Sequence, residues 1–106
     1  MTYQNLTFVT YRDTYFENAD HTLVDVRSKM EFQQGHVPHA INIPLNELPN
    51  RLSEIESNQS VVVICASGNR SQSGADIIAK AGFQHVYNLQ GGTMIWMMNN
   101  LPLARS

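Results

Sequence analysis

The chain has 106 residues, of which 42% are hydrophobic and 15% are charged, and its formal net charge is −2. This is the size of one ordinary domain, and the apolar content is not that of a disordered chain. Seven lysines and arginines without a basic run do not favour nucleic-acid binding, and a single cysteine excludes an intrachain disulfide and a multi-cysteine zinc site. We therefore expect one domain over residues 1–106, with no cofactor and no metal.

The N-terminus, MTYQNLTFVT, lacks the basic start and long apolar core of a signal peptide. No stretch approaches the roughly 18 apolar residues that a membrane helix needs. We expect a cytoplasmic protein that binds neither membrane nor nucleic acid.

Short apolar runs alternate with amphipathic segments along the chain, a pattern typical of βα units around a parallel sheet. The β-rich runs predict five strands, at residues 6–9, 22–26, 40–43, 61–64 and 85–88. The segments between and after them predict helices at residues 10–18, 28–34, 51–56, 71–81 and 93–98. We expect an α/β fold with a small, open, mainly parallel five-stranded sheet and helices on both faces.

Several residues indicate where these helices begin and end. Thr10, Ser28 and Ser71 are candidate N-caps, and Glu31 stands three residues after Ser28, at the capping-box position. Gly82 is a natural stop for the helix that begins near Ser71.

The stretch VVVICASGNRS, residues 61–71, places the only cysteine at the end of the predicted central strand. Ligands in open α/β sheets bind beyond the carboxyl ends of the strands, which is where Cys65 lies. Gly68 permits a tight curl of the backbone, and Arg70 adds a positive charge just ahead of the helix. The candidate binding loop comprises Ala66, Ser67, Gly68, Asn69 and Arg70.

This loop favours a reactive thiol over an inert one. A lone cysteine after an apolar strand is often only a buried core residue. Here, unpaired amides at a helix start, the positive end of the helix dipole and the charge of Arg70 would all favour a thiolate at Cys65. An inert cysteine needs neither the glycine nor the arginine.

Three segments carry signatures of a known family. They are LVDVRSKMEFQQGHVPHAINIP at residues 23–44, CASGNRS at residues 65–71 and NLQGGTMIWMMNNLPL at residues 88–103. In this order and spacing they resemble the rhodanese family of sulfurtransferases over almost the whole chain. One departure is His39, where the family often has glycine, and we expect it to affect only a loop.

The resemblance implies sulfur transfer through a persulfide on Cys65. The donor would be thiosulfate, a polysulfide or a low-molecular-weight persulfide, and the acceptor a thiol or cyanide. Because the chain has no second cysteine, an outside acceptor must remove the sulfur. An alternative is a carrier or regulatory module that serves a partner protein.

A phosphatase or arsenate reductase of the same fold is a further alternative. Related phosphatases have five residues between cysteine and arginine, whereas only four separate Cys65 from Arg70 here. By family analogy, the tighter ring suits a single terminal sulfur rather than a tetrahedral phosphate.

Four further residues are expected to support the loop: Asp25, Arg27, Glu31 and Ser71. Asp25 is either a carboxylate near the loop or an acceptor for amides of the turn that follows. Glu31 pairs either with Arg27 on the surface or with Arg70, and the resemblance favours an ion pair near the loop without deciding the arginine. It also implies a packing role for His36 rather than that of a base.

The last predicted helix is rich in methionine. Met94, Trp96, Met97 and Met98 are expected to lie mostly in the core, with one or two exposed, because consecutive residues cannot all face inward.

Overall fold

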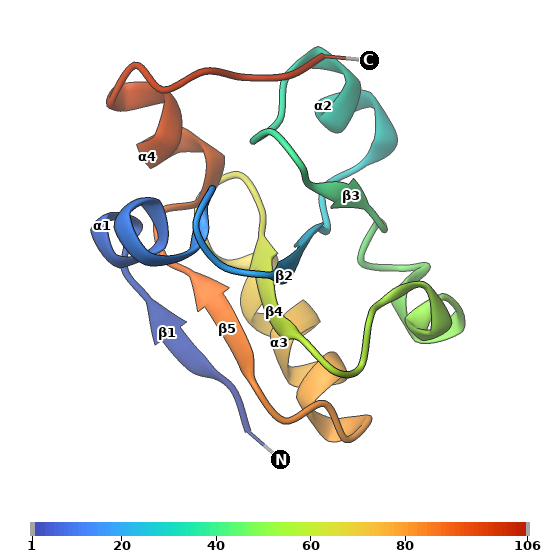
Figure 1. The fold of residues 1–106 in the computed structure, drawn as a ribbon. Coiled ribbons are helices and arrows are strands. Elements are labelled where there is room, and N and C mark those ends of the chain that lie inside the picture. The colour runs from blue at the N-terminus through green and yellow to red at the C-terminus, as the bar shows by residue number, and fades with distance from the viewer. Residues whose placement is uncertain (1, 106) are drawn as a thin grey trace.

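Five parallel strands form the sheet of this computed structural model, which describes residues 2–105 (Figure 1). The strands pair in the order β1-β5-β4-β2-β3. Their bounds are β1 Gln4–Leu6, β2 His21–Asp25, β3 Ile41–Asn42, β4 Ser60–Ile64 and β5 Val86–Leu89. β4 is central because its run of β-branched residues is fully buried on both faces. The predicted fold class is confirmed.

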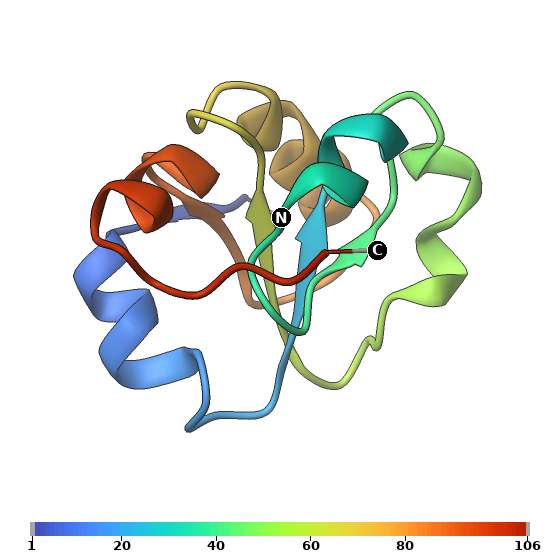
Figure 2. The same cartoon turned by 90° about the horizontal axis from the view of Figure 1, so that it is seen from above.

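Helices cover both faces of the sheet (Figure 2). Their bounds are α1 Phe8–Thr10, α2 Lys29–Gln34, α3 Arg70–Lys80 and α4 Gly92–Met98. Val61 and Val63 pack on the face covered by α3, whereas Val62 and Ile64 pack on the opposite face, with Trp96 of α4. This alternation follows from the period of two along a strand.

The N-terminal elements differ from the prediction. β1 lies at Gln4–Leu6 rather than at residues 6–9, and Thr10 has helical backbone angles and makes no capping hydrogen bond with its side chain. Thr7 caps α1 instead, because its hydroxyl accepts a hydrogen bond from the Thr10 amide at 3.2 Å. The helix then continues as a π-helical segment, Tyr11–Tyr15.

The helix predicted at residues 51–56 is also wrong. Two short 3₁₀ helices stand there, Leu48–Asn50 and Leu52–Glu54. Arg51 separates them because its backbone, with φ −128° and ψ 19°, is not helical.

The helix signals at Ser28, Glu31 and Gly82 are confirmed. Ser28 caps α2, and Glu31 completes the capping box by accepting from the Ser28 amide at 3.1 Å. Gly82 follows the end of α3 with a left-handed φ of +105°. Within residues 2–105, no helix has the length and apolarity needed to cross a membrane.

The exposed methionines of α4 overturn the expectation that this stretch is mostly core. Met94, Met97 and Met98 are 53%, 53% and 72% exposed, and Trp96 is fully buried. Trp96 packs edge-on to Phe16 at 4.7 Å and donates a hydrogen bond from Nε1 to the Pro102 carbonyl at 2.8 Å. One aromatic residue thus anchors the helix.

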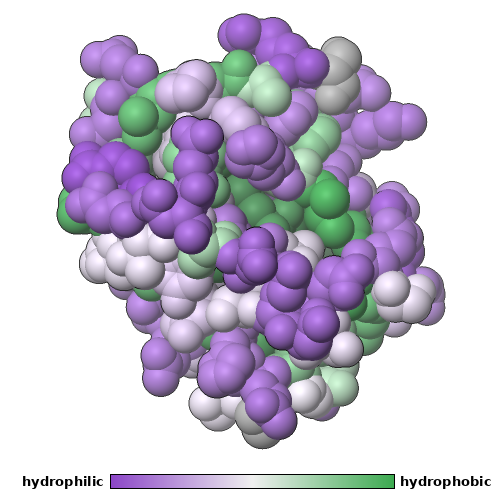
Figure 3. All heavy atoms as spheres, viewed as in Figure 1, coloured by the Kyte–Doolittle hydropathy of each residue, from purple (hydrophilic) through white to green (hydrophobic). Residues whose placement is uncertain are grey.

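Figure 3 shows the molecule from the same side as Figure 1. Apolar residues, in green, interrupt the hydrophilic surface on this side, including the region over α4.

Candidate active site

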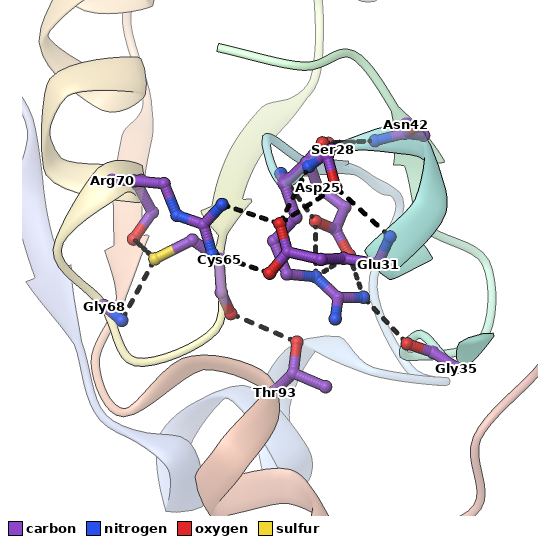
Figure 4. Close-up of polar contacts among 11 residues, drawn as sticks. Asp25, Ser28, Glu31, Gly35, Asn42, Cys65, Gly68, Arg70 and Thr93 are labelled. Carbon is purple, nitrogen blue, oxygen red and sulfur yellow. Dashed lines mark hydrogen bonds and ion pairs between the residues drawn. The ribbon is translucent and has the colours of Figure 1, made fainter. Parts of the chain in front are cut away.

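Cys65 follows β4 directly and begins the loop that leads to α3 (Figure 4). It is only 1% exposed. The backbone amide of Gly68 donates a hydrogen bond to Cys65 Sγ at 3.1 Å, and Ser71 Oγ lies 3.3 Å from the sulfur. Gly68 has a φ of +100°, so the curl of the loop depends on a residue without a side chain. The loop therefore turns an amide toward the sulfur, as expected.

The pKa of Cys65 lies below its ordinary value. Burial raises the pKa of this thiol, but hydrogen bonds from the Ser71 hydroxyl and from the backbone amides of Ser71, Gly68 and Ser67 outweigh burial and lower it. The site thus favours a thiolate through short-range donors of its own loop and helix.

Ser71 lies inside α3, so its prediction as the N-cap is wrong. The helix begins at Arg70, and Asn69 precedes it without a side-chain cap. The Ser71 hydroxyl is instead buried between the sulfur of Cys65 and the side-chain oxygen of Asn88. Its contact with the sulfur keeps it among the residues that support the loop.

The N-terminus of α4 holds the outer side of the loop. The amide of Thr93 donates to the Cys65 carbonyl at 2.9 Å, as does the Thr93 hydroxyl at 3.1 Å, and the amide of Met94 donates to the Ala66 carbonyl at 2.9 Å. Gly92 permits this approach, because a Cβ there would lie 2.3 Å from the Cys65 carbonyl oxygen. With its carbonyls bound to α4, the loop can present amides to the sulfur.

Glu31 pairs with Arg70 and not with Arg27. The Arg70 guanidinium donates to both carboxylate oxygens, with Nη1–Oε1 and Nη2–Oε2 distances of 2.8 and 2.9 Å. The hydrogen bonds from Arg70, helped by those from Ser28 and opposed by partial burial, lower the pKa of Glu31 to about 2. This ion pair fixes the far end of the loop to α2.

Asp25 instead holds Arg27 in a buried ion pair at the end of β2. Arg27 Nη2 lies 2.8 Å from Asp25 Oδ2, and its amide donates to Oδ1 at 3.0 Å. The same Nη2 donates to the Gly35 carbonyl at 2.8 Å. Asp25 and Arg27 therefore order the segment before α2. By accepting the Arg27 amide, Asp25 takes one of its two expected roles, that of an acceptor for the turn.

The two histidines of the first signature lie outside the loop. His36 stacks on Phe32 with ring centroids 3.6 Å apart, and its Nδ1 lies 2.8 Å from the Phe32 carbonyl oxygen. His39 is exposed and has a left-handed φ of +76° just before β3. Within residues 2–105, no three His, Cys, Asp or Glu side chains are grouped so that they could hold a metal ion.

Two hollows flank the loop. A polar hollow of about 230 Å³ is lined by uncharged side chains that include Asn69, Gln72 and Gln90. An apolar hollow of about 380 Å³ has Pro44 and Leu45 in its wall and Arg70 at its edge. Loop residues line both hollows: Ser67, Gly68 and Asn69 line the polar one, and Arg70 lines the apolar one.

The site thus consists of a central parallel strand that leads into a cysteine and a loop whose Gly68 amide faces the sulfur. A family model described as the rhodanese-like domain matches residues 10–99, and the chain belongs to this family.

Named relatives agree with this assignment. A sulfurtransferase of Allochromatium vinosum is 37% identical over 88 residues, which are 83% of this chain and 82% of the relative. A thiosulfate sulfurtransferase GlpE of Pseudomonas savastanoi is 34% identical over 74 residues, 70% of each chain. The crystal structure of a rhodanese-related protein from Thermoplasma volcanium matches with a TM-score of 0.84 and 27% identity, over 98% of this chain and 100% of that one. Some other curated relatives are longer, and this chain spans 40% to 62% of their length.

Proposed function

We propose that this protein is a sulfurtransferase that carries a sulfane sulfur as a persulfide on Cys65. The observation that carries the proposal is the placement of Cys65 Sγ, which receives the Gly68 amide at 3.1 Å at the end of the central strand. Membership of the rhodanese-like family and the sulfurtransferase names of two relatives support it.

The reaction would proceed in two displacements. The Cys65 thiolate attacks the outer sulfur of the donor, so that a new S–S bond forms and the old S–S bond breaks. The leaving group departs with the electron pair, as sulfite from thiosulfate or as a shortened polysulfide. The amides of the loop then stabilise the negative terminal sulfur, much as an oxyanion hole stabilises oxygen. An acceptor thiolate or cyanide attacks that sulfur and regenerates the Cys65 thiolate.

The charge balance of the loop favours a donor of low charge. Arg70 is the only cation of the loop, and both of its terminal nitrogens are bound by Glu31. A dianion, whether thiosulfate or an inorganic polysulfide, would thus gain little from Arg70, whereas the singly charged persulfide of an uncharged small thiol depends more on the amides. We propose such a small persulfide as the better donor, although the GlpE relative is named for thiosulfate.

Mass measurement of the intact protein tests the proposal. The protein is incubated with thiosulfate, polysulfide or a small-thiol persulfide, and a gain of one sulfur atom is expected in each reactive case. The gain should be absent from Cys65→Ser and reversed by cyanide or excess thiol. Initial rates then rank the donors. If no donor adds sulfur to the protein, the proposal of an enzyme is rejected. If only a persulfidated protein adds it, the alternative of a sulfur carrier replaces that proposal.

A parallel assay addresses the phosphatase alternative. Hydrolysis of an aryl phosphate should be undetectable, because four residues separate Cys65 from Arg70 and, by family analogy, a ring of this size suits one terminal sulfur rather than a tetrahedral phosphate. Turnover that disappears in Cys65→Ser would contradict the proposal.

A further inference from the structure

A chain of four polar side chains runs from the sulfur to the surface. Cys65 Sγ lies 3.3 Å from Ser71 Oγ, Ser71 Oγ contacts Asn88 Oδ1, and Asn88 Nδ2 lies 3.1 Å from Asn5 Oδ1. Ser71 and Asn88 are 0% and 1% exposed, whereas Asn5 is exposed. This hydrogen-bonded chain thus connects the loop, α3, β5 and β1, and among Ser71, Asn88 and Asn5 only Asn5 is exposed.

The Ser71 hydroxyl can serve only one acceptor at a time, because it carries one proton. In the thiol form, Cys65 donates to Ser71 and Ser71 donates to Asn88. When the thiol gives its proton to solvent, the sulfur becomes an acceptor only and needs the Ser71 proton. If Asn88 stayed as it is, its buried oxygen would then lose its donor, which is unfavourable in a buried site.

Asparagine can avoid that loss because its two ends are complementary. A turn of the amide by 180° places Nδ2 toward Ser71 Oγ and Oδ1 toward Asn5. Asn5 can turn in the same way, since it is the last of the four hydrogen-bonded side chains and is exposed to water. Every hydrogen bond is then kept with its direction reversed.

We propose that Asn88 is a positioning residue that lets this chain reverse, so that Cys65 keeps its hydrogen bonds both as thiol and as thiolate. The inference deepens the proposed function, because the thiolate is the form that would take up sulfur. No member of the chain other than Cys65 changes its charge.

The charged groups around Cys65 cannot change the direction of a hydrogen bond when the thiol ionises. Arg70 of α3 is paired with Glu31 of α2, and Asp25 at the end of β2 is paired with Arg27. The Gly68 amide is fixed by the backbone and donates only. The Ser71 hydroxyl is therefore the polar contact of the sulfur that can change direction.

Two substitutions at position 88 separate this role from simple packing, because they predict opposite results. Asn88→Asp offers only acceptors, so it would hold the Ser71 proton away from the sulfur and disfavour the thiolate. Asn88→Leu offers no acceptor, so it would leave that proton free for the sulfur. We expect alkylation by iodoacetamide at neutral pH to slow about tenfold in Asn88→Asp and to stay within about twofold or become faster in Asn88→Leu.

The pH profile of alkylation gives the direction of each change without any sulfur donor. The profile of Asn88→Asp should move to higher pH and that of Asn88→Leu should not. Gln90→Glu is the matched control, since it adds the same charge at the exposed rim of the polar hollow without touching Ser71. An equal slowing in Asn88→Asp and Asn88→Leu, or an effect of Gln90→Glu as large as that of Asn88→Asp, would overturn the proposal.

A measurement on the unmodified protein covers the case in which Asn88→Leu does not fold. The side-chain amide resonances of Asn88 should shift across the same pH range in which Cys65 ionises, and Cys65→Ser should abolish that shift. Resonances that stay constant while the thiol titrates would reject the reversal. Because alkylation and resonance shifts need no sulfur donor, their failure is distinct from a failure of sulfur uptake.

Discussion

Glu31 and Arg70 join α2 to the first residue of α3 through two hydrogen bonds of 2.8 and 2.9 Å. The same carboxylate closes the capping box of α2 with Ser28. One side chain thus starts one helix, fixes the end of the loop before another and neutralises the cation of that loop.

Glu31→Gln should change donor preference with little loss of stability. Glutamine also serves at this position of a capping box, so α2 keeps its cap while Arg70 loses its counter-charge. The exposed ion pair contributes less than about 1 kcal/mol. We expect the rate with thiosulfate to rise severalfold relative to that with the singly charged persulfide of an uncharged small thiol at low salt, and the gain to shrink at high salt.

Ser28→Ala is the matched control for this substitution. It removes the cap, at a cost of about 1 kcal/mol in the free energy of unfolding, but leaves the ion pair. Its ratio of the thiosulfate rate to the small-persulfide rate should equal that of the unmodified protein. An unchanged ratio in Glu31→Gln would refute the argument from charge.

The Glu31–Arg70 pair should stabilise the protein at neutral pH, and this stabilisation should be lost at acidic pH. The pKa of Glu31 is lowered from 4.5 to about 2, so the carboxylate is favoured in the folded state. Its stabilisation is fully present above the unfolded pKa and is lost as pH falls from about 4.5 toward about 2. Urea unfolding of the unmodified protein and of Glu31→Gln should therefore differ at about pH 7 and converge at about pH 2. A difference that does not depend on pH would exclude the ion pair as its source.

Gly92→Ala should displace the loop. A Cβ at this position would lie 2.3 Å from the Cys65 carbonyl oxygen and 2.7 Å from that of Ala66, and the φ of +56° is itself unfavourable for alanine. We expect a loss of more than about 2 kcal/mol in the free energy of unfolding and slower sulfur uptake by Cys65. Urea unfolding and the mass assay measure the two effects.

Gly82→Ala is the control that introduces unfavourable backbone angles without a steric clash. Its φ is +105°, but a Cβ there would meet nothing within 4 Å. We expect a loss of about 1 kcal/mol with unchanged sulfur uptake. If the two variants lost the same stability and activity, the close approach of α4 to the loop would have no special importance.

His39→Gly should stabilise the protein slightly. His39 has a φ of +76°, which glycine adopts without strain. Relief of that strain, reduced by the greater freedom of glycine in the unfolded chain, leaves a gain of up to about 1 kcal/mol, measured by thermal unfolding. A loss would mean that the contact of its ring with Phe16, at 5.8 Å, contributes more than the backbone costs. Asn100→Gly, at φ +58°, should change stability less because asparagine tolerates this region.

The sequence predicts the central strands well because their composition allows one reading. Val61–Ile64 is β-branched throughout, and the structure places β4 at Ser60–Ile64. The first strand fails because TFVT is equally β-rich, yet a threonine at its start caps a helix. Local propensity does not decide between these outcomes, since packing against Trp96 favours the helix.

The loop of the candidate site was predictable from the sequence, whereas the residues that contact the loop from other elements were much less so. Cys65, Gly68 and Arg70 are close in sequence, so their spacing indicates a cradle. Asn88 and Thr93 contact that cradle from 23 and 28 residues further along the chain than Cys65, and no local pattern connects them to it. The Gly91-Gly92 pair was the available signal, because adjacent glycines at a helix start indicate a close approach of backbone.

The hydrogen bonds from α4 to the Cys65 and Ala66 carbonyls limit how this loop can diverge. An additional residue between Cys65 and Ala66 would move the Ala66 carbonyl away from the Met94 amide and leave backbone groups unpaired. A loop lengthened at this point would therefore need a simultaneous change in residues 91–94. The length of the loop and the start of α4 would be inherited together, so a single insertion is a poor evolutionary route from this chemistry to another.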